Sequence, residues 1–292
     1  MKKFRGTGVA IVKPFKNDTS IDFAAFGRII DHVIKGGVNY IVAMGTTGEA
    51  STLTRDEKQA VLSYVTESIN GRVPLVAGIG GNNTQEIINC IRSLDLTGVD
   101  GILSVAPYYN KPGQRGLLQH FKAIATCSPL PVIIYNVPGR TSINILPDTT
   151  LELAHECDNI IGIKEASGDL GQIMKIIKGK PESFQVISGD DMLTIPVIAA
   201  GGSGVISVLA NAWPAECSEL VNNALKNNFR QAREIHFRFI EIIDLLFADG
   251  NPSGIKAFMS VMNLCKNNVR LPLVPVSKNI QARIQKAVED LG

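Results

Sequence analysis

The stretch Asn159-Ile160-Ile161-Gly162-Ile163-Lys164 is an apolar run bounded by polar residues, and it ends in a lysine. A run of this kind is typical of a short buried strand. Because side chains alternate between the two faces of a strand, we expect Lys164 to share a face with Gly162 and Ile160. Burial lowers the pKa of a lysine, and a neutral amine can attack a carbonyl carbon. The alternative is an ordinary lysine at a strand end that pairs with Glu165.

Eight such runs occur before about residue 225, and segments with helical periodicity separate them. Thr54-Arg55-Asp56-Glu57 is a capping box that predicts a helix over residues 56–69, and a second helix is predicted over 84–96. Alternating strands and helices favour parallel pairing, and eight strands close a (β/α)8 barrel. The alternative is an open doubly wound sheet, but the glycine-rich segment 78–82 lacks the third glycine of a dinucleotide-binding loop. The predicted strands are 8–13, 39–44, 73–79, 100–106, 131–136, 159–164, 184–189 and 204–208.

The alternation of strands and helices stops near residue 226. We therefore predict a catalytic barrel over residues 1–225 and a small C-terminal α-helical domain over residues 226–292. Within this tail the apolar periodicity predicts one long helix over 229–247 and shorter helices over 253–265 and 277–291. The segment Asp249-Gly250-Asn251-Pro252 has the composition of a turn.

Composition and charge exclude several classes of protein. The formal net charge is +2 and the charged residues are spread evenly, so neither a nucleic acid nor a membrane surface is expected as a partner. No apolar run reaches the length of about 18 residues that a bilayer span requires, and the amino terminus does not resemble a signal peptide. The five cysteines are scattered and form no C-x-x-C pair. Reduced thiols and a cytoplasmic protein are therefore predicted.

Polar residues gather where the predicted strands end, which is where the active sites of these barrels lie. Lys164 ends the sixth predicted strand. Four other strand ends carry Thr46-Thr47-Gly48-Glu49, Tyr108-Tyr109-Asn110, Tyr135-Asn136 and Gly189-Asp190-Asp191. Because the carboxyl ends of all strands meet at one mouth, this convergence favours a catalytic Lys164 over a structural one.

Each companion of Lys164 also has an ordinary structural interpretation. Tyr135 can be a core tyrosine whose hydroxyl is satisfied, and Arg140 can be a surface arginine instead of a carboxylate ligand. Thr46-Thr47-Gly48 suits a carboxylate cradle or a simple capped turn. The two aspartates 190 and 191 suit a metal site, but the favoured interpretation is that one of them caps the following helix.

Two absences narrow the chemistry. The four histidines are isolated and show no metal-ligand spacing, so no metal is predicted and a metal-dependent aldolase is disfavoured. Gly201-Gly202-Ser203-Gly204 resembles a phosphate loop but precedes the eighth strand, at the wrong end of the barrel for a phosphate site. An unphosphorylated substrate is therefore expected.

Six motifs, in this order along the chain, resemble those of the dihydrodipicolinate synthase family, whose current name is 4-hydroxy-tetrahydrodipicolinate synthase. The resemblance covers essentially the whole chain. Arg140 and the doubled threonine are its more specific marks, since the broader superfamily shares the lysine and the tyrosine. The motifs are Gly45-Thr46-Thr47-Gly48-Glu49, Pro107-Tyr108-Tyr109-Asn110, Tyr135-Asn136-Val137-Pro138-Gly139-Arg140-Thr141, Gly162-Ile163-Lys164-Glu165-Ala166, Ser188-Gly189-Asp190-Asp191 and Gly204-Val205-Ile206-Ser207.

The resemblance implies a lyase that condenses pyruvate with aspartate semialdehyde through a Schiff base on Lys164. The product would be 4-hydroxy-tetrahydrodipicolinate, a precursor of diaminopimelate and lysine. No cofactor is implied, and a homotetramer built as a dimer of dimers is the family norm.

The resemblance also implies residue roles. Proton relay would fall to Tyr135, Thr46 and Tyr109, with Tyr109 reaching in from a neighbouring subunit. Arg140 would bind the carboxylate of the semialdehyde. Pyruvate would be held by Thr47 and Ile206, and Gly189 would line the Schiff-base pocket.

The family's regulatory lysine site fits this chain less well. Ser51, Asn82, Glu86 and Tyr108 match that site, but Arg55 and Lys58 stand where well-known lysine-sensitive members carry histidine. Fixed positive charges should weaken the binding of a cationic ligand. We therefore predict weak or absent inhibition by lysine.

Two other functions fit parts of the pattern. A sister pyruvate lyase, such as N-acetylneuraminate lyase or a keto-deoxy sugar-acid aldolase, would use the same Lys164 and Tyr135, but these relatives generally lack Arg140. A catalytically silent barrel that senses a keto acid would be expected to lose Lys164 or Tyr135. The sequence keeps both residues.

Overall fold

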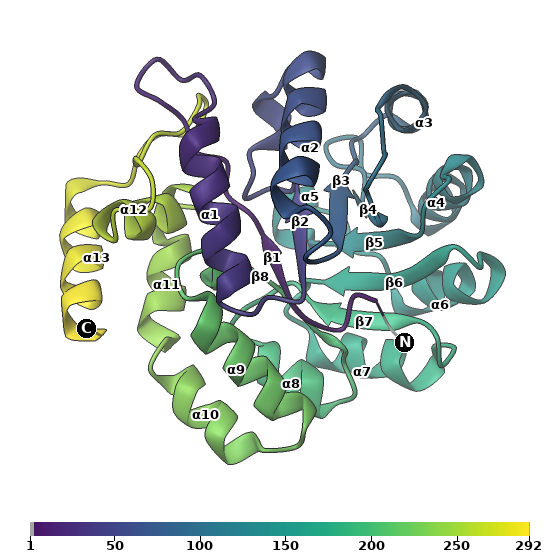
Figure 1. The fold of residues 1–292 in the computed structure, drawn as a ribbon. Helices are drawn as coiled ribbons and strands as arrows, with labels where there is room; N and C mark the ends of the chain where they lie inside the picture. Colours follow the sequence, from purple (N-terminus) through teal and green to yellow (C-terminus); the bar gives the residue numbers. More distant parts are fainter. Residues whose placement is uncertain (1–2, 292) are drawn as a thin grey trace.

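The computed structural model describes residues 3–291, and its centre is a closed barrel of eight parallel strands (Figure 1). Neighbours in the sequence are neighbours in the barrel, and β8 closes it by pairing with β1. The (β/α)8 prediction is confirmed. The strands are β1 (Gly6–Ala10), β2 (Tyr40–Ala43), β3 (Leu75–Gly78), β4 (Gly101–Val105), β5 (Val132–Asn136), β6 (Ile160–Glu165), β7 (Gln185–Ser188) and β8 (Gly204–Ser207).

Each strand contributes to two separate apolar layers, since its side chains alternate between the barrel interior and the surrounding helices. Phe4, Tyr40 and Leu103 belong to the interior cluster, whereas Ile41 and Ile102 pack outward against helices. Burial on both faces explains why the strands appear in the sequence as continuous apolar runs.

Helices follow the strands and cover the outside of the barrel (Figure 1). The capping box is confirmed, because Thr54 accepts a hydrogen bond from Glu57 N and the Glu57 side chain accepts one from Thr54 N. The helices are α1 (Phe23–Lys35), α2 (Arg55–Ile69), α3 (Thr84–Ser93), α4 (Gln114–Cys127), α5 (Pro138–Thr141), α6 (Pro147–Glu156), α7 (Leu170–Gly179), α8 (Thr194–Ala199) and α9 (Pro214–Leu225), with 3₁₀ turns η1 (Ala50–Thr52) and η2 (Leu209–Asn211).

The first strand differs from the predicted range 8–13, because β1 begins at Gly6 and ends at Ala10. Ile11 N still donates to Val42 O of β2 at 3.1 Å, and the backbone leaves the strand ladder after this bond. Val12 N donates to the Asn211 side chain at 2.9 Å instead of to a neighbouring strand. The apolar residues that follow Ala10 therefore start the loop that leads to α1.

A β-bulge in β6 corrects the predicted alternation of side chains. The pairing with β5 shifts between Val132 and Ile133, which pair with Ile160 and Gly162 respectively. The extra residue, Ile161, packs against the interior cluster, while Ile160 packs with the outer one. Lys164 therefore shares its face with Gly162, as predicted, but not with Ile160, because one inserted residue reverses the alternation.

The C-terminal tail forms α10 (Phe229–Phe237), α11 (Ile240–Ala248), α12 (Ser253–Val261) and α13 (Lys278–Leu291). The prediction of a single helix over 229–247 is wrong. Arg238 N and Phe239 N bond to the carbonyls three residues earlier, which tightens the turn and separates α10 from α11. Phe239 is buried there against Trp213, with ring centroids 5.5 Å apart.

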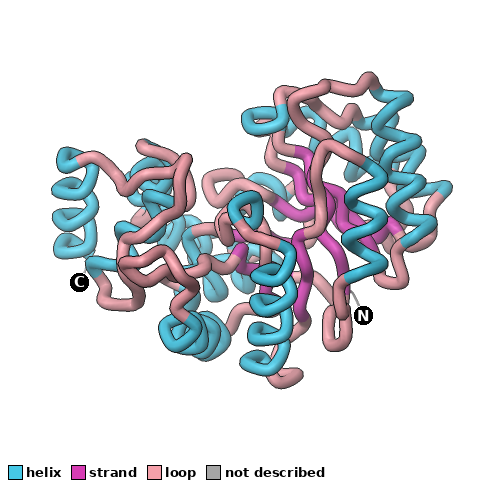
Figure 2. Tube along the Cα trace, turned by 90° about the horizontal axis from the view of Figure 1, so that it is seen from above, coloured by secondary structure: helices cyan, strands magenta, loops and turns pink. Residues whose placement is uncertain are grey.

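The last three helices gather on one side of the strands (Figure 2). The predicted boundary at residue 225 falls between α9 and α10, which pack against each other. The division into two domains stays a prediction. None of the helices in residues 3–291 combines the length and the hydropathy that a bilayer span requires.

Candidate active site

Lys164 and Tyr135 lie side by side at the carboxyl ends of neighbouring strands. They are partners in the pairing of β5 with β6, and the Lys164 Nζ lies 4.4 Å from the centroid of the Tyr135 ring. Both side chains are buried, with only 6% and 7% of their surface exposed. A lysine amine thus lies against an aromatic face, close to a phenol that can exchange protons.

Burial lowers the pKa of Lys164 to about 8. The carboxylate of Asp191 opposes this shift, and the charge of Arg140 adds to it. Desolvation is the largest of the three effects, so a much larger fraction of Lys164 is neutral near pH 7 than of an ordinary lysine. A neutral amine in this position is a competent nucleophile.

The alternative pairing of Lys164 with Glu165 is wrong. Glu165 lies next to it on the strand and so points to the opposite face. Its buried carboxylate accepts hydrogen bonds from Asn136 Nδ2 at 3.1 and 3.2 Å, from Gln172 Nε2 at 3.0 Å and from Ser167 N at 2.8 Å. This network ties β5 to β6 directly behind Tyr135 and Lys164, and so fixes their relative position.

Gly189 leaves the space that the Lys164 side chain occupies. A Cβ atom at this position would lie 2.9 Å from Lys164 Cε and 2.8 Å from Ala166 Cβ. Both distances are shorter than carbon–carbon contacts allow. The backbone of Gly189 is held in place by a hydrogen bond of 2.8 Å from its N–H to the Glu165 carbonyl.

The hydroxyl of Tyr135 points toward the loop after β2. Burial raises the pKa of Tyr135 to about 12, and the nearby Arg140 charge and a hydrogen bond with the Thr46 side chain oppose that shift. The phenol is therefore protonated at neutral pH and has a hydroxyl partner through which a proton can move. Arg140 itself is exposed, on the short helix α5.

The Thr46-Thr47 pair sits in a turn that is closed by its own backbone. Gly48 N donates to Gly45 O at 3.1 Å, and Glu49 N donates to Thr46 O at 3.0 Å. Thr46 is exposed at the mouth, whereas Thr47 is buried. The turn of the capped-turn interpretation is thus present, but no side chain caps the 3₁₀ turn that follows it. The turn also presents the Thr46 hydroxyl to Tyr135.

Asn251, which lies beside the mouth, was not identified from the sequence. Asn251, in the loop between α11 and α12, donates from Nδ2 to Thr47 Oγ1 at 3.0 Å. Its carbonyl lies 3.5 Å from an Arg140 guanidinium nitrogen. The sequence showed Asn251 only as part of a turn, and no local pattern links residues 204 positions apart.

The prediction that Asp190 or Asp191 caps the following helix is wrong. Neither Asp190 nor Asp191 caps α8, which begins after Leu193 without a side-chain cap. The buried Asp191 carboxylate accepts from Val208 N at 2.9 Å and from Leu209 N at 3.2 Å. It therefore joins the ends of β7 and β8 and lies near enough to Lys164 to affect its pKa.

The remaining predicted site residues lie at different distances from this centre. Ile206 is fully buried in the interior cluster and pairs with Gly8 of β1. Tyr109, in contrast, is 86% exposed and has a left-handed backbone with a φ of 74°. A single chain leaves its ring without a covering surface.

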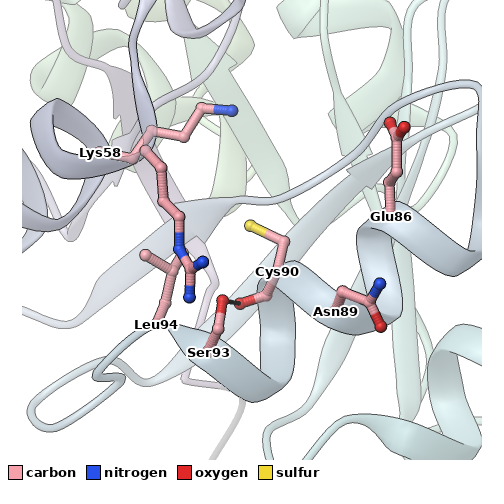
Figure 3. A pocket seen from close by; sticks show the side chains of 7 residues that line it. Lys58, Glu86, Asn89, Cys90, Ser93 and Leu94 are labelled. Carbon is pink, nitrogen blue, oxygen red and sulfur yellow. Dashed lines mark hydrogen bonds between the residues drawn. The ribbon is translucent and has the colours of Figure 1, made fainter.

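The six candidate regulatory residues only partly share a groove. A groove of about 500 Å³ between α2 and α3 is lined by Arg55, Lys58 and Glu86 together with Asn89, Cys90, Ser93 and Leu94. Figure 3 shows Lys58 and Glu86 on opposite sides of it, with Cys90 between them. Ser51, Asn82 and Tyr108 are outside this lining.

No group of three or more metal-ligating side chains occurs in the part of the chain that the structure describes. The four histidines lie on α1, α4, α6 and α10, apart from the mouth. The side chains that meet at the mouth are instead an amine, a phenol and a hydroxyl. A closed barrel with this set at its carboxyl end is typical of a (β/α)8-barrel enzyme that uses a lysine amine as its nucleophile.

Comparison with known proteins identifies the family. Residues 3–291 match the model of the dihydrodipicolinate synthetase family. The chain is 50% identical to the 4-hydroxy-tetrahydrodipicolinate synthase of Flavobacterium psychrophilum over 292 residues, the full length of both. The crystal structure of dihydrodipicolinate synthase from Aquifex aeolicus superposes with a TM-score of 0.95 at 40% identity, covering 99% of this chain and 98% of that one. The chain belongs to the dihydrodipicolinate synthetase family.

A third similar structure concerns the binding of lysine. The family enzyme of Cyanidioschyzon merolae, whose crystal structure has lysine bound, matches with a TM-score of 0.94 at 34% identity. The match covers 99% of this chain and 98% of that one.

Proposed function

We propose that the chain condenses pyruvate with aspartate semialdehyde at the mouth of the barrel, with Lys164 as the Schiff-base lysine. The chain is a lyase of lysine and diaminopimelate biosynthesis, as its curated relatives named 4-hydroxy-tetrahydrodipicolinate synthase indicate. The observation that carries the residue assignment is the buried Lys164 amine, 4.4 Å from the Tyr135 ring at the carboxyl end of β6.

The reaction begins when the neutral Lys164 amine attacks the keto carbon of pyruvate. The carbinolamine loses water to give an imine, and loss of a methyl proton converts the imine into an enamine. The enamine carbon then forms a bond to the aldehyde carbon of the semialdehyde, whose oxygen takes up a proton. Finally the substrate's own amine attacks the imine carbon, closes the ring and releases Lys164 for the next cycle.

These steps require protons to enter and leave near Lys164. Tyr135 is the main donor and acceptor, and Thr46 passes protons between it and Tyr109. The hydrogen bond between Thr46 and Tyr135 supports this order. Tyr109 comes from a neighbouring subunit, a role supported by its 86% exposure in the single chain.

Substrate binding involves four further residues. Thr47 and the main chain at Ile206 hold the pyruvate carboxylate, and Gly189 keeps the wall beside the Schiff base free of side-chain atoms. Arg140 binds the carboxylate of the semialdehyde, since a guanidinium offers paired donors to a carboxylate. The exposed position of Arg140 at the rim suits the second substrate.

The assembly that completes such a site is a homotetramer, and the reaction would take place in the cytoplasm. All five cysteines are free thiols, which supports a reducing compartment.

The test is turnover of pyruvate and aspartate semialdehyde, followed by coupled reduction of the product. We expect activity in the unaltered chain and none in Lys164→Ala, because the variant has no amine to form the imine. Arg140→Ala should keep borohydride-trappable Schiff base with pyruvate while raising the KM for the semialdehyde. Absence of turnover in folded, unaltered protein would contradict the proposal, and sugar-acid cleavage would then be tested.

A further inference from the structure

A group of charged residues, partly or fully buried, surrounds Phe15, close to the mouth of the barrel. We call it the Phe15 cluster; it consists of Phe15, Lys13, Glu49, Glu57, Lys256 and Arg270. Three cations lie over the Phe15 ring: Lys13 Nζ at 5.0 Å, Lys256 Nζ at 4.3 Å and Arg270 Cζ at 4.6 Å from its centroid. The first two belong to lysines that are 1% and 0% exposed.

The two carboxylates of the Phe15 cluster are already paired without Lys13. Lys256 Nζ bonds to Glu49 Oε1 at 2.5 Å, and the Arg270 backbone N–H donates to Glu49 Oε2 at 3.0 Å. The Arg270 guanidinium binds both oxygens of Glu57. Among the described residues, these are the ion pairs of the cluster. Three cations face two carboxylates, so Lys13 is not needed to neutralise charge.

Lys13 instead binds the backbone of the turn that carries the two threonines. Its Nζ donates to the carbonyl of Gly48 at 2.7 Å and to that of Glu49 at 3.4 Å. Glu49 has a left-handed backbone with a φ of 50°, which is unfavourable for a residue with a side chain. The turn therefore needs contacts from outside to hold its shape.

We propose that Lys13 is a positioning residue for the condensation, holding the turn over residues 45–49 so that the Thr46 hydroxyl stays on Tyr135. Lys13 acts through the Gly48 and Glu49 carbonyls and does not touch the substrate. The inference rests on the proposed function, in which Thr46 passes protons to and from Tyr135.

The chemistry of Lys13 suits this role across the neutral range. Burial lowers its pKa to about 7, with the charges of Lys256 and Arg270 adding to the shift and the carboxylates of Glu49 and Glu57 opposing it. Both protonation states keep N–H donors for a carbonyl. The bond to the Gly48 carbonyl is therefore present in both states and is stronger when the amine is charged.

A double-mutant cycle tests whether Lys13 acts through Thr46. The variants are Lys13→Met, Thr46→Val and the pair combined, with Lys16→Met as the matched control because Lys16 is an exposed lysine on the same loop. Turnover is divided by the number of sites that form a borohydride-trappable Schiff base with pyruvate. A variant that gives less folded protein is therefore not scored as less active for that reason. Methionine removes the donor but keeps the length and the apolar stem of lysine.

We expect Lys13→Met to lower this turnover by about tenfold or more when Thr46 is present, and by less than about twofold in the Thr46→Val background. An equal loss in both backgrounds, or no loss in the first, would overturn the proposal. Should Lys13→Met not fold, Lys13→Leu, which also lacks an N–H donor, takes its place, with the same comparison of backgrounds. Turnover by the unaltered chain and by Lys16→Met tests the proposed function separately. If both proteins are active, a negative result of the double-mutant cycle contradicts only the role of Lys13.

Discussion

At the scale of single residues, the reactivity of Lys164 comes from competition between burial and charge. Burial lowers its pKa, Asp191 raises it and Arg140 lowers it, and desolvation is the largest effect. Asp191 is itself buried, and burial raises its pKa despite the two backbone N–H groups it accepts from. The balance leaves a lysine that titrates within reach of neutral pH.

The rate of Schiff-base formation with pyruvate should therefore rise with pH and level off above about 8. Attack requires the neutral amine, and its fraction falls about tenfold for each pH unit below the pKa. Borohydride inactivation in the presence of pyruvate, measured as a function of pH, gives the inflection. Asp191→Asn should move that inflection down and Arg140→Ala should move it up. An inflection near the ordinary lysine value of 10.5 would show that Lys164 is not desolvated in solution.

At the scale of elements, the start of α2 is tied to the C-terminal tail by Glu57. One carboxylate completes the capping box with Thr54 and also receives the Arg270 guanidinium, 213 residues away in the sequence. The hydrogen bonds from Arg270 lower the pKa of Glu57 to about 2. The capping box thus predicts only the local role of Glu57 and not its ion pair with Arg270.

Glu57→Gln should lower the free energy of unfolding by about 1–2 kcal/mol at neutral pH, since it weakens a cap and removes a partly buried ion pair. The pKa of Glu57 is lower in the folded chain than in the unfolded one, so its stabilising contribution is complete above about pH 4.5. It is lost as pH falls toward about 2. Urea unfolding at pH 7 and at lower pH measures the difference.

The matched control for this element is Glu67→Gln, an exposed glutamate on the same helix. Its effect on unfolding should stay within about 0.5 kcal/mol. A difference between Glu57→Gln and the unaltered chain that does not shrink in acid would contradict the assigned role of the Glu57 charge.

At the scale of the whole molecule, three of the candidate regulatory residues, Arg55, Lys58 and Glu86, line the groove between α2 and α3. Arg55 and Lys58 are basic, and Glu86 supplies a single carboxylate. Figure 3 shows Lys58 and Glu86 on opposite sides of the groove. A bound lysine would bring two ammonium groups and one carboxylate near them. Repulsion between like charges at such distances opposes binding.

Lysine at about 1 mM should accordingly leave the steady-state rate nearly unchanged, as the charges of Arg55 and Lys58 predict. The combined change of Arg55→His and Lys58→His should make the enzyme more sensitive at alkaline pH, where histidine is neutral. Strong inhibition of the unaltered chain below 1 mM would refute the prediction. Initial rates at several lysine concentrations provide the measurement.

Local patterns were sufficient to predict the eight strands, the closed barrel and the residues at the strand ends. Each strand is an apolar run between turn residues, and parallel strands bring their carboxyl ends to one edge, so Lys164, Tyr135 and Thr46 could be grouped before any coordinates. The family resemblance added residue roles that geometry alone does not supply. The role of Tyr109 stays a prediction, because it depends on contact with a second chain.

Tertiary structure decided the features that depend on distant residues or on small irregularities. The bulge at Ile161 reverses an alternation, and a 3₁₀ turn divides α10 from α11. Gly162 follows the bulge directly, whereas neither glycine nor proline marks the 3₁₀ turn. Asn251 on Thr47 and Arg270 on Glu49 join residues 204 and 221 positions apart. Such contacts produce no periodic pattern in the sequence. A periodic pattern reflects the secondary structure around a residue, whereas the distant residue that it contacts is decided by the tertiary fold.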